Sequence, residues 1–131
     1  MAYQYDGSGI VITQTATADL SGSQYRLVKV DTNTDGNVVI CGAVTDKPLG
    51  VLLNKPAAGQ AATILCAGVT QLASGAAVAN GDTIGVDITG RGVNQAPVNA
   101  NPVFGQALST SGGAGQIITV AINCLSSQPG A

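Results

Sequence analysis

Several residue types that carry chemistry in proteins are missing from this 131-residue chain. It contains no histidine, no tryptophan and no glutamate, and its seven acidic residues are all aspartates. The absence of histidine excludes Ser-His-Asp and Cys-His nucleophile systems and any metal site built on imidazole. We therefore expect no catalytic residue, no cofactor and no metal, and we expect that the protein is not an enzyme.

Charged and aromatic side chains are scarce as well. Charged residues make up 9% of the chain, against about 25% in a typical domain, and the net charge is −2. Five basic residues on an acidic chain give little attraction for a phosphate backbone. Four aromatic residues offer few platforms on which bases or sugars could stack. We expect no nucleic-acid partner.

Long apolar runs are also missing. The run at residues 10–12 is far shorter than the core of a signal peptide, and no stretch approaches the roughly 20 apolar residues that a membrane helix needs. We therefore expect synthesis in the cytosol and no membrane partner. Three widely spaced cysteines, Cys41, Cys66 and Cys124, are an odd count, which favours buried free thiols.

The chain is rich in glycine and in β-branched residues. Eighteen glycines and five prolines fall at short intervals, and the longest window free of both, residues 23–35, contains several valines and threonines. A long helix has no room to form, so this pattern predicts several short strands. The predicted strands cover residues 10–15, 24–30, 37–41, 49–53, 63–67, 69–72, 82–88, 103–108 and 116–122.

These strands predict an all-β fold, a small antiparallel β-barrel or sandwich with short turns and at most one helical turn, at residues 73–79. Ile84, Val86 and Ile88 are expected to share one buried face, and residues 118–122 repeat the same alternation. The expected organisation is an amino-terminal arm, a single β domain and a carboxy-terminal tail, at residues 1–9, 10–125 and 126–131.

One polar segment resembles part of a metal site. Residues 31–36 match the first half of an EF-hand calcium loop, in which Asp31, Asn33 and Asp35 would supply oxygen ligands. The match fails at the twelfth position, where Gly42 stands in place of a bidentate Glu. The segment is therefore either a calcium candidate or a polar hairpin turn whose side chains bond the local backbone.

Two segments are candidate interfaces. Tyr3 and Tyr5 lie at alternate positions, so their side chains point the same way in an extended arm. Such an arm either covers the protein's own core or docks on a neighbouring subunit, where Tyr is frequent. The uncharged residues 93–102 are predicted to form a surface loop, where binding residues are common. The candidate interface residues of this loop are Asn94, Gln95, Asn99 and Asn101.

The order of segments carries a family resemblance. Pro-Leu-Gly-Val-Leu-Leu at 48–53 is followed by Ala-Thr-Ile-Leu-Cys-Ala-Gly-Val at 62–69, Asn-Gly-Asp at 80–82, Gly-Arg-Gly-Val at 90–93, Val-Phe-Gly-Gln-Ala-Leu at 103–108 and Gly-Gln-Ile-Ile-Thr-Val at 115–120. Over roughly residues 10–123 this order resembles the small bacteriophage capsid cement, or head decoration, proteins. The structural turn and strand-entry positions that match are Gly50, Gly81, Asp82, Gly90, Gly105 and Gly115.

The resemblance implies a compact, tulip-like β-barrel without catalytic residues. It also implies assembly as a homo-oligomer, often a homotrimer, on the capsid exterior of the virion. Such a protein binds the major capsid protein, bridges neighbouring capsid subunits and so stabilises the head. We keep two alternatives. One is a secreted or surface β-sandwich binding module, an adhesin or carbohydrate-binding domain, and the other is an enzyme that pairs Asp82 with Asp87.

Overall fold

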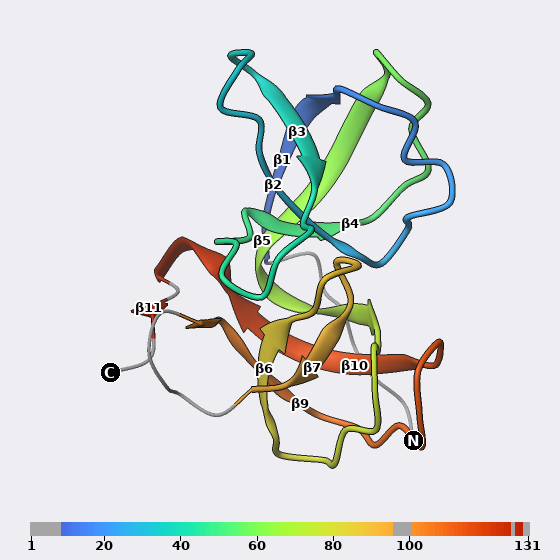
Figure 1. Ribbon diagram of the computed structural model, residues 1–131, viewed down its shortest axis with the longest axis vertical. Helices are drawn as coiled ribbons and strands as arrows, with labels where there is room; N and C mark the ends of the chain where they lie inside the picture. Colours follow the sequence, from blue (N-terminus) through green and yellow to red (C-terminus); the bar gives the residue numbers. More distant parts are fainter. Residues whose placement is uncertain (1–8, 96–100, 127, 130–131) are drawn as a thin grey trace.

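The computed structural model describes residues 9–95, 101–126 and 128–129, and its regular structure is almost entirely β-strand (Figure 1). The prediction of a small all-β fold is confirmed. Within the described chain, the helical structure is one short 3₁₀ turn, η1 (Cys124–Ser126). The strands are β1 (Ile10–Ala16), β2 (Leu27–Val30), β3 (Asn37–Ile40), β4 (Gly50–Leu52), β5 (Ala61–Ala73), β6 (Thr83–Val86), β7 (Gly92–Asn94), β8 (Pro102–Val103), β9 (Gly105–Ala107), β10 (Ile117–Asn123) and β11 (Gln128–Pro129).

Five strands close into a barrel, the upper half of the molecule in Figure 1. They follow one another in the order β1-β3-β2-β4-β5, and β1 then pairs antiparallel with the first part of β5, which closes the ring. The pairing of β1 with β3 is parallel, whereas the other neighbours in the barrel are antiparallel. Ring closure removes free strand edges. We call this half the barrel lobe.

Strand β5 belongs to a second structure as well. Its 13 residues run out of the barrel, and its second half pairs with β10 from Ala67 to Ala73. Strands β9, β6 and β7 follow β10 in that order and complete the lower half of Figure 1, which we call the sheet lobe. Strands β8 and β11 form a separate two-stranded ribbon. The two lobes are therefore joined through one continuous strand.

Strand β5 bends from one lobe into the other at Gly68. The φ angle of Gly68 is +136°, a conformation that residues with a side chain rarely adopt, and a Cβ there would lie 3.1 Å from the Cα of Gly9. The sequence predicts two separate strands, one before this glycine at residues 63–67 and one after it at residues 69–72. That prediction is wrong because Gly68 bends the strand without interrupting its pairing with β10.

Two apolar cores lie on opposite faces of strands β2 and β4. Neighbouring residues of β2 and β4 enter different cores: Leu27 and Val51 pack in the sheet-lobe core, Val28 and Leu52 in the barrel core. All four side chains are completely buried. Strands covered on both faces have apolar residues in sequence rather than at alternate positions. This double burial accounts for the consecutive apolar residues in β2 and β4.

The strands that are covered on one face follow the predicted alternation. The inward residues of β10 are almost fully buried: Ile118 is 1% exposed, Val120 0% and Ile122 5%. In β6, Ile84 and Val86 are completely buried, which confirms their expected face. The prediction is wrong for Ile88, which is 70% exposed, because β6 ends at Val86 and Ile88 belongs to the turn that follows.

Three further expectations about elements are wrong. No helical turn forms at residues 73–79, because Ala73 ends β5 and Ser74 makes an extended bridge to Gly92. The strand expected at residues 103–108 is divided between β8 and β9, which pair with different partners. The start of the expected loop at residues 93–102 is strand β7, which returns antiparallel along β6.

Candidate interaction surface

One face of the sheet lobe points away from its core. Side chains directly opposite each other on antiparallel strands share a face, so the register aligns residues from four strands into rows. The first row joins Val69, Ala121, Gln106 and Thr83 on β5, β10, β9 and β6. We call the set of residues in three such rows the outer face: Val69, Ala121, Gln106 and Thr83; Gln71, Thr119 and Leu108; Ala73 and Ile117.

The outer face carries no charged side chain. Along the whole chain, nine of the twelve charged residues fall within residues 1–55, and the three that follow are Asp82, Asp87 and Arg91. All three lysines precede residue 56 and lie in the barrel lobe. The molecule therefore has a charged barrel lobe and a sheet lobe with very little charge.

Large apolar side chains are exposed on the outer face. Val69 on β5 is 41% exposed, Leu108 directly after β9 is 37% exposed, and Ile117 on β10 is 49% exposed. Thr119 and Ala121 on β10 lie between them, and Thr119 is itself only 6% exposed. Apolar groups gathered on an uncharged sheet face are typical of a surface that contacts another protein.

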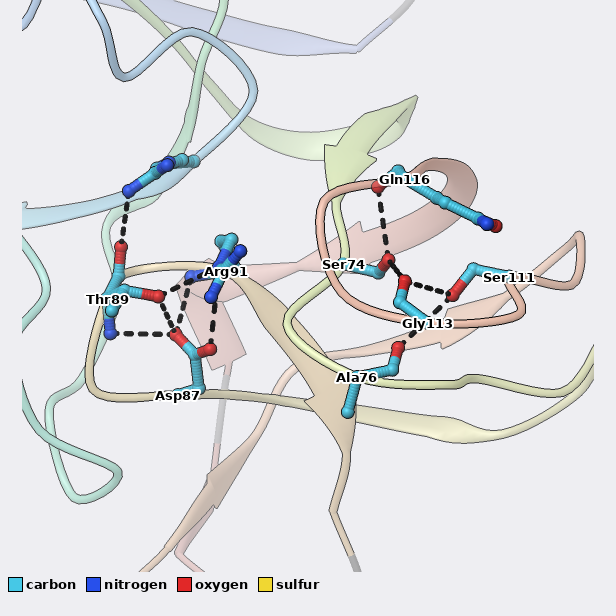
Figure 2. A network of polar contacts seen from close by, with 9 residues as sticks. Ser74, Ala76, Asp87, Thr89, Arg91, Ser111, Gly113 and Gln116 are labelled. Carbon is cyan, nitrogen blue, oxygen red and sulfur yellow. Dashed lines mark hydrogen bonds and ion pairs between the residues drawn. The ribbon is translucent and has the colours of Figure 1, made fainter.

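A polar network fixes the turn between β6 and β7 (Figure 2). The Asp87 Oδ1 atom accepts hydrogen bonds from the Thr89 N–H at 2.8 Å, the Thr89 hydroxyl at 2.8 Å and the Arg91 N–H at 2.9 Å. The Arg91 Nε atom donates to the Thr89 hydroxyl oxygen at 2.9 Å. Arg26 of the barrel lobe donates to the Thr89 carbonyl at 3.3 Å. The network therefore fastens the turn to the barrel.

A second network in Figure 2 holds the loop that precedes β10. The hydroxyl of the completely buried Ser74 lies 3.0 Å from the Gly113 carbonyl and 3.1 Å from the Gln116 carbonyl. The Ser111 hydroxyl donates to the Ala76 carbonyl at 3.1 Å. Among the residues that the structure describes, every buried side-chain nitrogen or oxygen has a hydrogen-bond partner. These buried polar groups serve the fold.

The structure does not bring Asp82 and Asp87 together. They flank the two ends of β6, and five steps at a rise of roughly 3.3 Å per residue separate them by about 16 Å. Asp82 Oδ2 accepts the Ala79 N–H at 2.8 Å and thereby stabilises its own turn, while Asp87 is engaged by Thr89 and Arg91. The two carboxylates therefore cannot share a proton.

The calcium candidate is the turn of the β2–β3 hairpin. Asp31 accepts a hydrogen bond from the Thr17 hydroxyl at 2.7 Å and one from the Asn33 N–H at 3.0 Å, and these bonds lower the pKa of Asp31. Asp35 is exposed to solvent. Across residues 9–95, 101–126 and 128–129, no three acidic or thiol side chains gather as metal ligands. The bond from the Asn33 N–H to Asp31 is the local backbone contact of a polar hairpin turn.

The five glycines at the positions that resemble the head decoration proteins fall into two groups. Gly81, Gly90 and Gly115 have φ angles of +93°, +80° and +85°, so they lie in turns that favour glycine. Gly50 and Gly105 are the first residues of β4 and β9, where a Cβ would collide with a carbonyl of the adjacent strand. The first group shapes turns, and the second allows close packing of neighbouring backbones.

The interface candidates from the sequence are scattered. Asn94 ends β7 and is exposed, whereas Gln95 is half-buried and its N–H donates to the Thr83 carbonyl at 2.9 Å. Asn101 is half-buried before β8. The remaining candidates lie outside the described residues, and they are Tyr3, Tyr5 and Asn99.

A groove of about 850 Å³ opens on the barrel lobe beside the β2–β3 hairpin and η1. Its charged residues are partly paired, since Lys29 Nζ lies 3.0 Å from Asp46 Oδ1. Leu49 and Leu125 line it as well. The groove thus combines an ion pair with apolar walls.

The three cysteines are buried, as expected from the sequence, and none of them forms a disulfide. Burial raises the pKa of the Cys41 thiol to about 12, and burial also raises the pKa of the Cys124 thiol to about 12. Burial also raises the pKa of the Cys66 thiol. Because the thiolate is the reactive form, these side chains act as small apolar groups.

In the described part of the chain, no helix has the length and apolar character needed to span a membrane. The fold defines a class, that of small all-β proteins in which a closed five-stranded barrel is extended by a further sheet. No family model matches the chain, and no curated protein sequence matches it significantly.

Among solved structures, the chain is similar to the crystal structure of the head fiber gp8.5 N base in bacteriophage phi29. The TM-score is 0.69, and the match covers 88% of this chain and 94% of that chain. The sequence identity is 20%, so the likeness shows a shared fold.

The outer face was not found from the sequence. Its residues come from β5, β6, β9 and β10, whose order in the sheet differs from their order in the chain. One signal was available, because the last 76 residues contain only three charged side chains. That asymmetry identifies the sheet lobe as the part least adapted to contact with water.

Proposed function

We propose that the protein is a structural component of a phage head and that it has no enzymatic activity. The observation that carries the proposal is the shared fold with a phage head fiber base over 88% of this chain. The order of segments supports it independently, because that order resembles head decoration proteins. In this proposal the protein is made in the host cytoplasm and binds the capsid exterior of the virion.

The proposed partner is the major capsid protein, whose neighbouring subunits this chain would bridge. The protein acts as a homo-oligomer, with a trimer favoured. Bridging stabilises a shell because opening it requires these additional contacts to break. A stable contact of this kind buries about 1,600 Å², and repetition on a lattice strengthens contacts that are weak singly. The uncharged outer face supports a role based on such contacts.

The carbohydrate-binding alternative has less support. Sugar-binding sites commonly stack a sugar ring on an exposed aromatic side chain. Of the aromatic residues in the described part of the chain, Phe104 is 5% exposed and Tyr25 is half-buried. Neither offers an open ring, so we favour the head protein.

In this proposal the amino-terminal arm contacts a neighbouring subunit through Tyr3 and Tyr5. Deleting residues 1–9 is therefore expected to weaken attachment to heads more than it lowers the melting temperature of the protein. A large loss of stability with unchanged attachment would instead assign the arm to the protein's own core.

The proposal is tested by the heat stability of phage heads. DNA-filled heads that lack the protein are incubated with or without it, and the temperature of DNA release is measured by dye fluorescence. We expect the protein to sediment with the heads and to raise the release temperature. Equal release temperatures, or protein that stays in the supernatant, would reject the proposed function.

A further inference from the structure

We propose that the turn between β6 and β7 binds a partner surface on which a carboxylate lies beside an apolar pocket. This role rests on the proposed function and deepens it, because it assigns that partner surface to the major capsid protein. The binding groups are the side chains of Ile88, Arg91 and Arg26, which we call the turn surface.

Ile88 lies at the tip of the turn and is 70% exposed, more than any other large apolar side chain in the described part of the chain. It belongs to neither apolar core. Asp87 and Gly90 flank it in a β-turn, in which the Gly90 N–H donates to the Asp87 carbonyl at 3.4 Å. Turns favour glycine, proline and small polar residues, whereas isoleucine favours strands. The fold therefore does not require an isoleucine here, and its apolar surface is open to another molecule.

Two arginine side chains distinguish Ile88 from a singly exposed apolar residue, which is common on protein surfaces. Both hold the adjacent Thr89: Arg91 donates to its hydroxyl oxygen at 2.9 Å and Arg26 donates to its carbonyl at 3.3 Å (Figure 2). Within the described chain, these bonds use one nitrogen of each guanidinium group, which has five N–H donors. The other donors can bind a carboxylate, most strongly as a bidentate pair.

Local charge determines the sign of the partner. The turn surface together with Asp87 carries two positive charges and one negative charge, on a chain whose net charge is −2. The Asp87 Oδ2 atom lies 3.7 Å from Arg91 Nε, whereas Arg26 forms no ion pair with the described residues. A complementary partner therefore supplies an acidic group. Arginine beside an exposed large apolar side chain is typical of the residues that dominate contacts between proteins.

The turn is held in one position, which lowers the entropic cost of binding. Asp87 accepts the Thr89 and Arg91 N–H groups from within the turn. The Leu27 N–H donates to the Gly90 carbonyl at 2.6 Å and, like Arg26, connects the turn to the barrel lobe. We therefore expect the turn surface to act as an anchor that supplies a large share of the binding energy of a wider contact.

The first test compares the binding of variants to heads that lack the protein, measured by pelleting. Ile88→Ser should weaken binding about tenfold or more, because it removes the apolar anchor. Its matched control is Val30→Ser, which removes a 53% exposed apolar side chain from β2 and should bind as wild type does. Arg26→Gln should weaken binding and reduce its dependence on salt, whereas Lys55→Gln, which removes an exposed positive charge elsewhere, should do neither. The melting temperature of each variant shows that it is folded.

The second test needs no head. The pure protein is titrated with isocaproate, which joins a carboxylate to a branched apolar chain, and in parallel with the uncharged isocaproamide. Proton–nitrogen NMR spectra follow the backbone amide of Ile88 and the Nε–H groups of Arg26 and Arg91. We expect saturable shifts with isocaproate at a Kd on the order of 10 mM, and weaker binding of the amide. Arg26→Gln should reduce the difference between the two compounds.

Three results would overturn the inference: Ile88→Ser that pellets with heads as wild type does, equal effects of Arg26→Gln and Lys55→Gln, or equal shifts of the turn by isocaproate and its amide. Sedimentation of the pure protein supplies a fourth, since self-association lost in Ile88→Ser with head binding retained would assign the turn to a second copy. Wild-type protein that does not pellet with heads would reject the proposed function, and the isocaproate titration would then decide the turn surface by itself.

Discussion

At the scale of single residues, the junction between the lobes depends on unusual backbone conformations. Gly90 has a φ angle of +80°, and the Leu27 N–H donates to its carbonyl at 2.6 Å. Tyr25 has a φ angle of +65°, uncommon for a residue with a side chain. Its N–H donates to the Leu52 carbonyl at 2.7 Å, and its carbonyl accepts the Ala73 N–H at 2.8 Å. These hydrogen bonds hold both residues in place.

A glycine can be required by a positive φ angle or by a close contact with a neighbouring atom, and these two causes can be separated by experiment. At Gly115 the φ angle is +85° with open space around a Cβ, so Gly115→Ala should lower the free energy of unfolding by about 1 kcal/mol. At Gly90 a Cβ would also lie 2.7 Å from the Ile40 Cδ1 atom, so Gly90→Ala should cost about 2–4 kcal/mol. Urea denaturation measures both, and equal losses would contradict the role given to the contact with Ile40.

Asp31 gives the protein a stability that depends on pH. The Thr17 hydroxyl and the Asn33 N–H lower the pKa of Asp31 below its ordinary value of 3.8. Its stabilising effect is therefore present above that value and is lost as the pH falls through the lowered pKa. Asp31→Asn should melt below wild type at neutral pH, and the difference should shrink in acid. Asp35→Asn on the same turn is the control, and a difference that persists in acid would contradict the assignment.

At the scale of elements, β10 separates core from surface within two adjacent residues. Ile118 is 1% exposed in the sheet-lobe core, whereas Ile117 is 49% exposed on the outer face. Ile118→Asp should cost about 3–5 kcal/mol or more and unfold the protein, because it buries an unpaired charge. Ile117→Asp should fold with a melting temperature close to wild type. Circular dichroism distinguishes them, and a folded Ile118→Asp would reverse the assignment of the two faces.

Regular elements could be predicted from the sequence, whereas shared and irregular ones could not. The alternation of β10 depends on one buried face, so residues 118–122 show it directly. Strand β7 contains Gly92 and Asn94, which have low strand propensity, and it forms because its backbone pairs with β6. The bend at Gly68 depends on the placement of β10 and Gly9, so no local pattern reports it.

The candidate surface was harder to predict than the fold. Sequence reasoning selected tyrosines, asparagines and one glutamine in segments without a strand pattern, such as Asn94 and Gln95. The outer face consists of residues that look ordinary within each strand, such as Gln71 and Ala121. They become a surface only when the register of β5, β10 and β9 places them side by side.

At the scale of the whole molecule, the two lobes should unfold together. Strand β5 runs through both, and the strands between the two cores contribute side chains to each. Cys66 lies in the barrel core and Cys124 in the sheet-lobe core, both at most 3% exposed. Under partly denaturing conditions, both thiols should be alkylated by iodoacetamide at the same rate. Faster labelling of Cys124 than Cys66, measured by mass spectrometry, would show that the lobes open separately.

The arrangement of charge over the molecule also suits a protein that works by contact. The charged barrel lobe suits exposure to water, whereas the sheet lobe offers an uncharged face to other proteins. Nothing in this division requires a substrate. In the proposed function, a phage head supplies the neighbouring proteins that such a face would contact.

The most direct test of the central claim is the number of copies bound to each head. Heads without the protein are mixed with increasing amounts of it and pelleted, and the bound copies are counted by quantitative mass spectrometry. The account predicts binding that saturates at a fixed number of copies per head, set by the repeating sites of the shell. Protein that remains in the supernatant at every concentration, or that pellets without saturation, would contradict it.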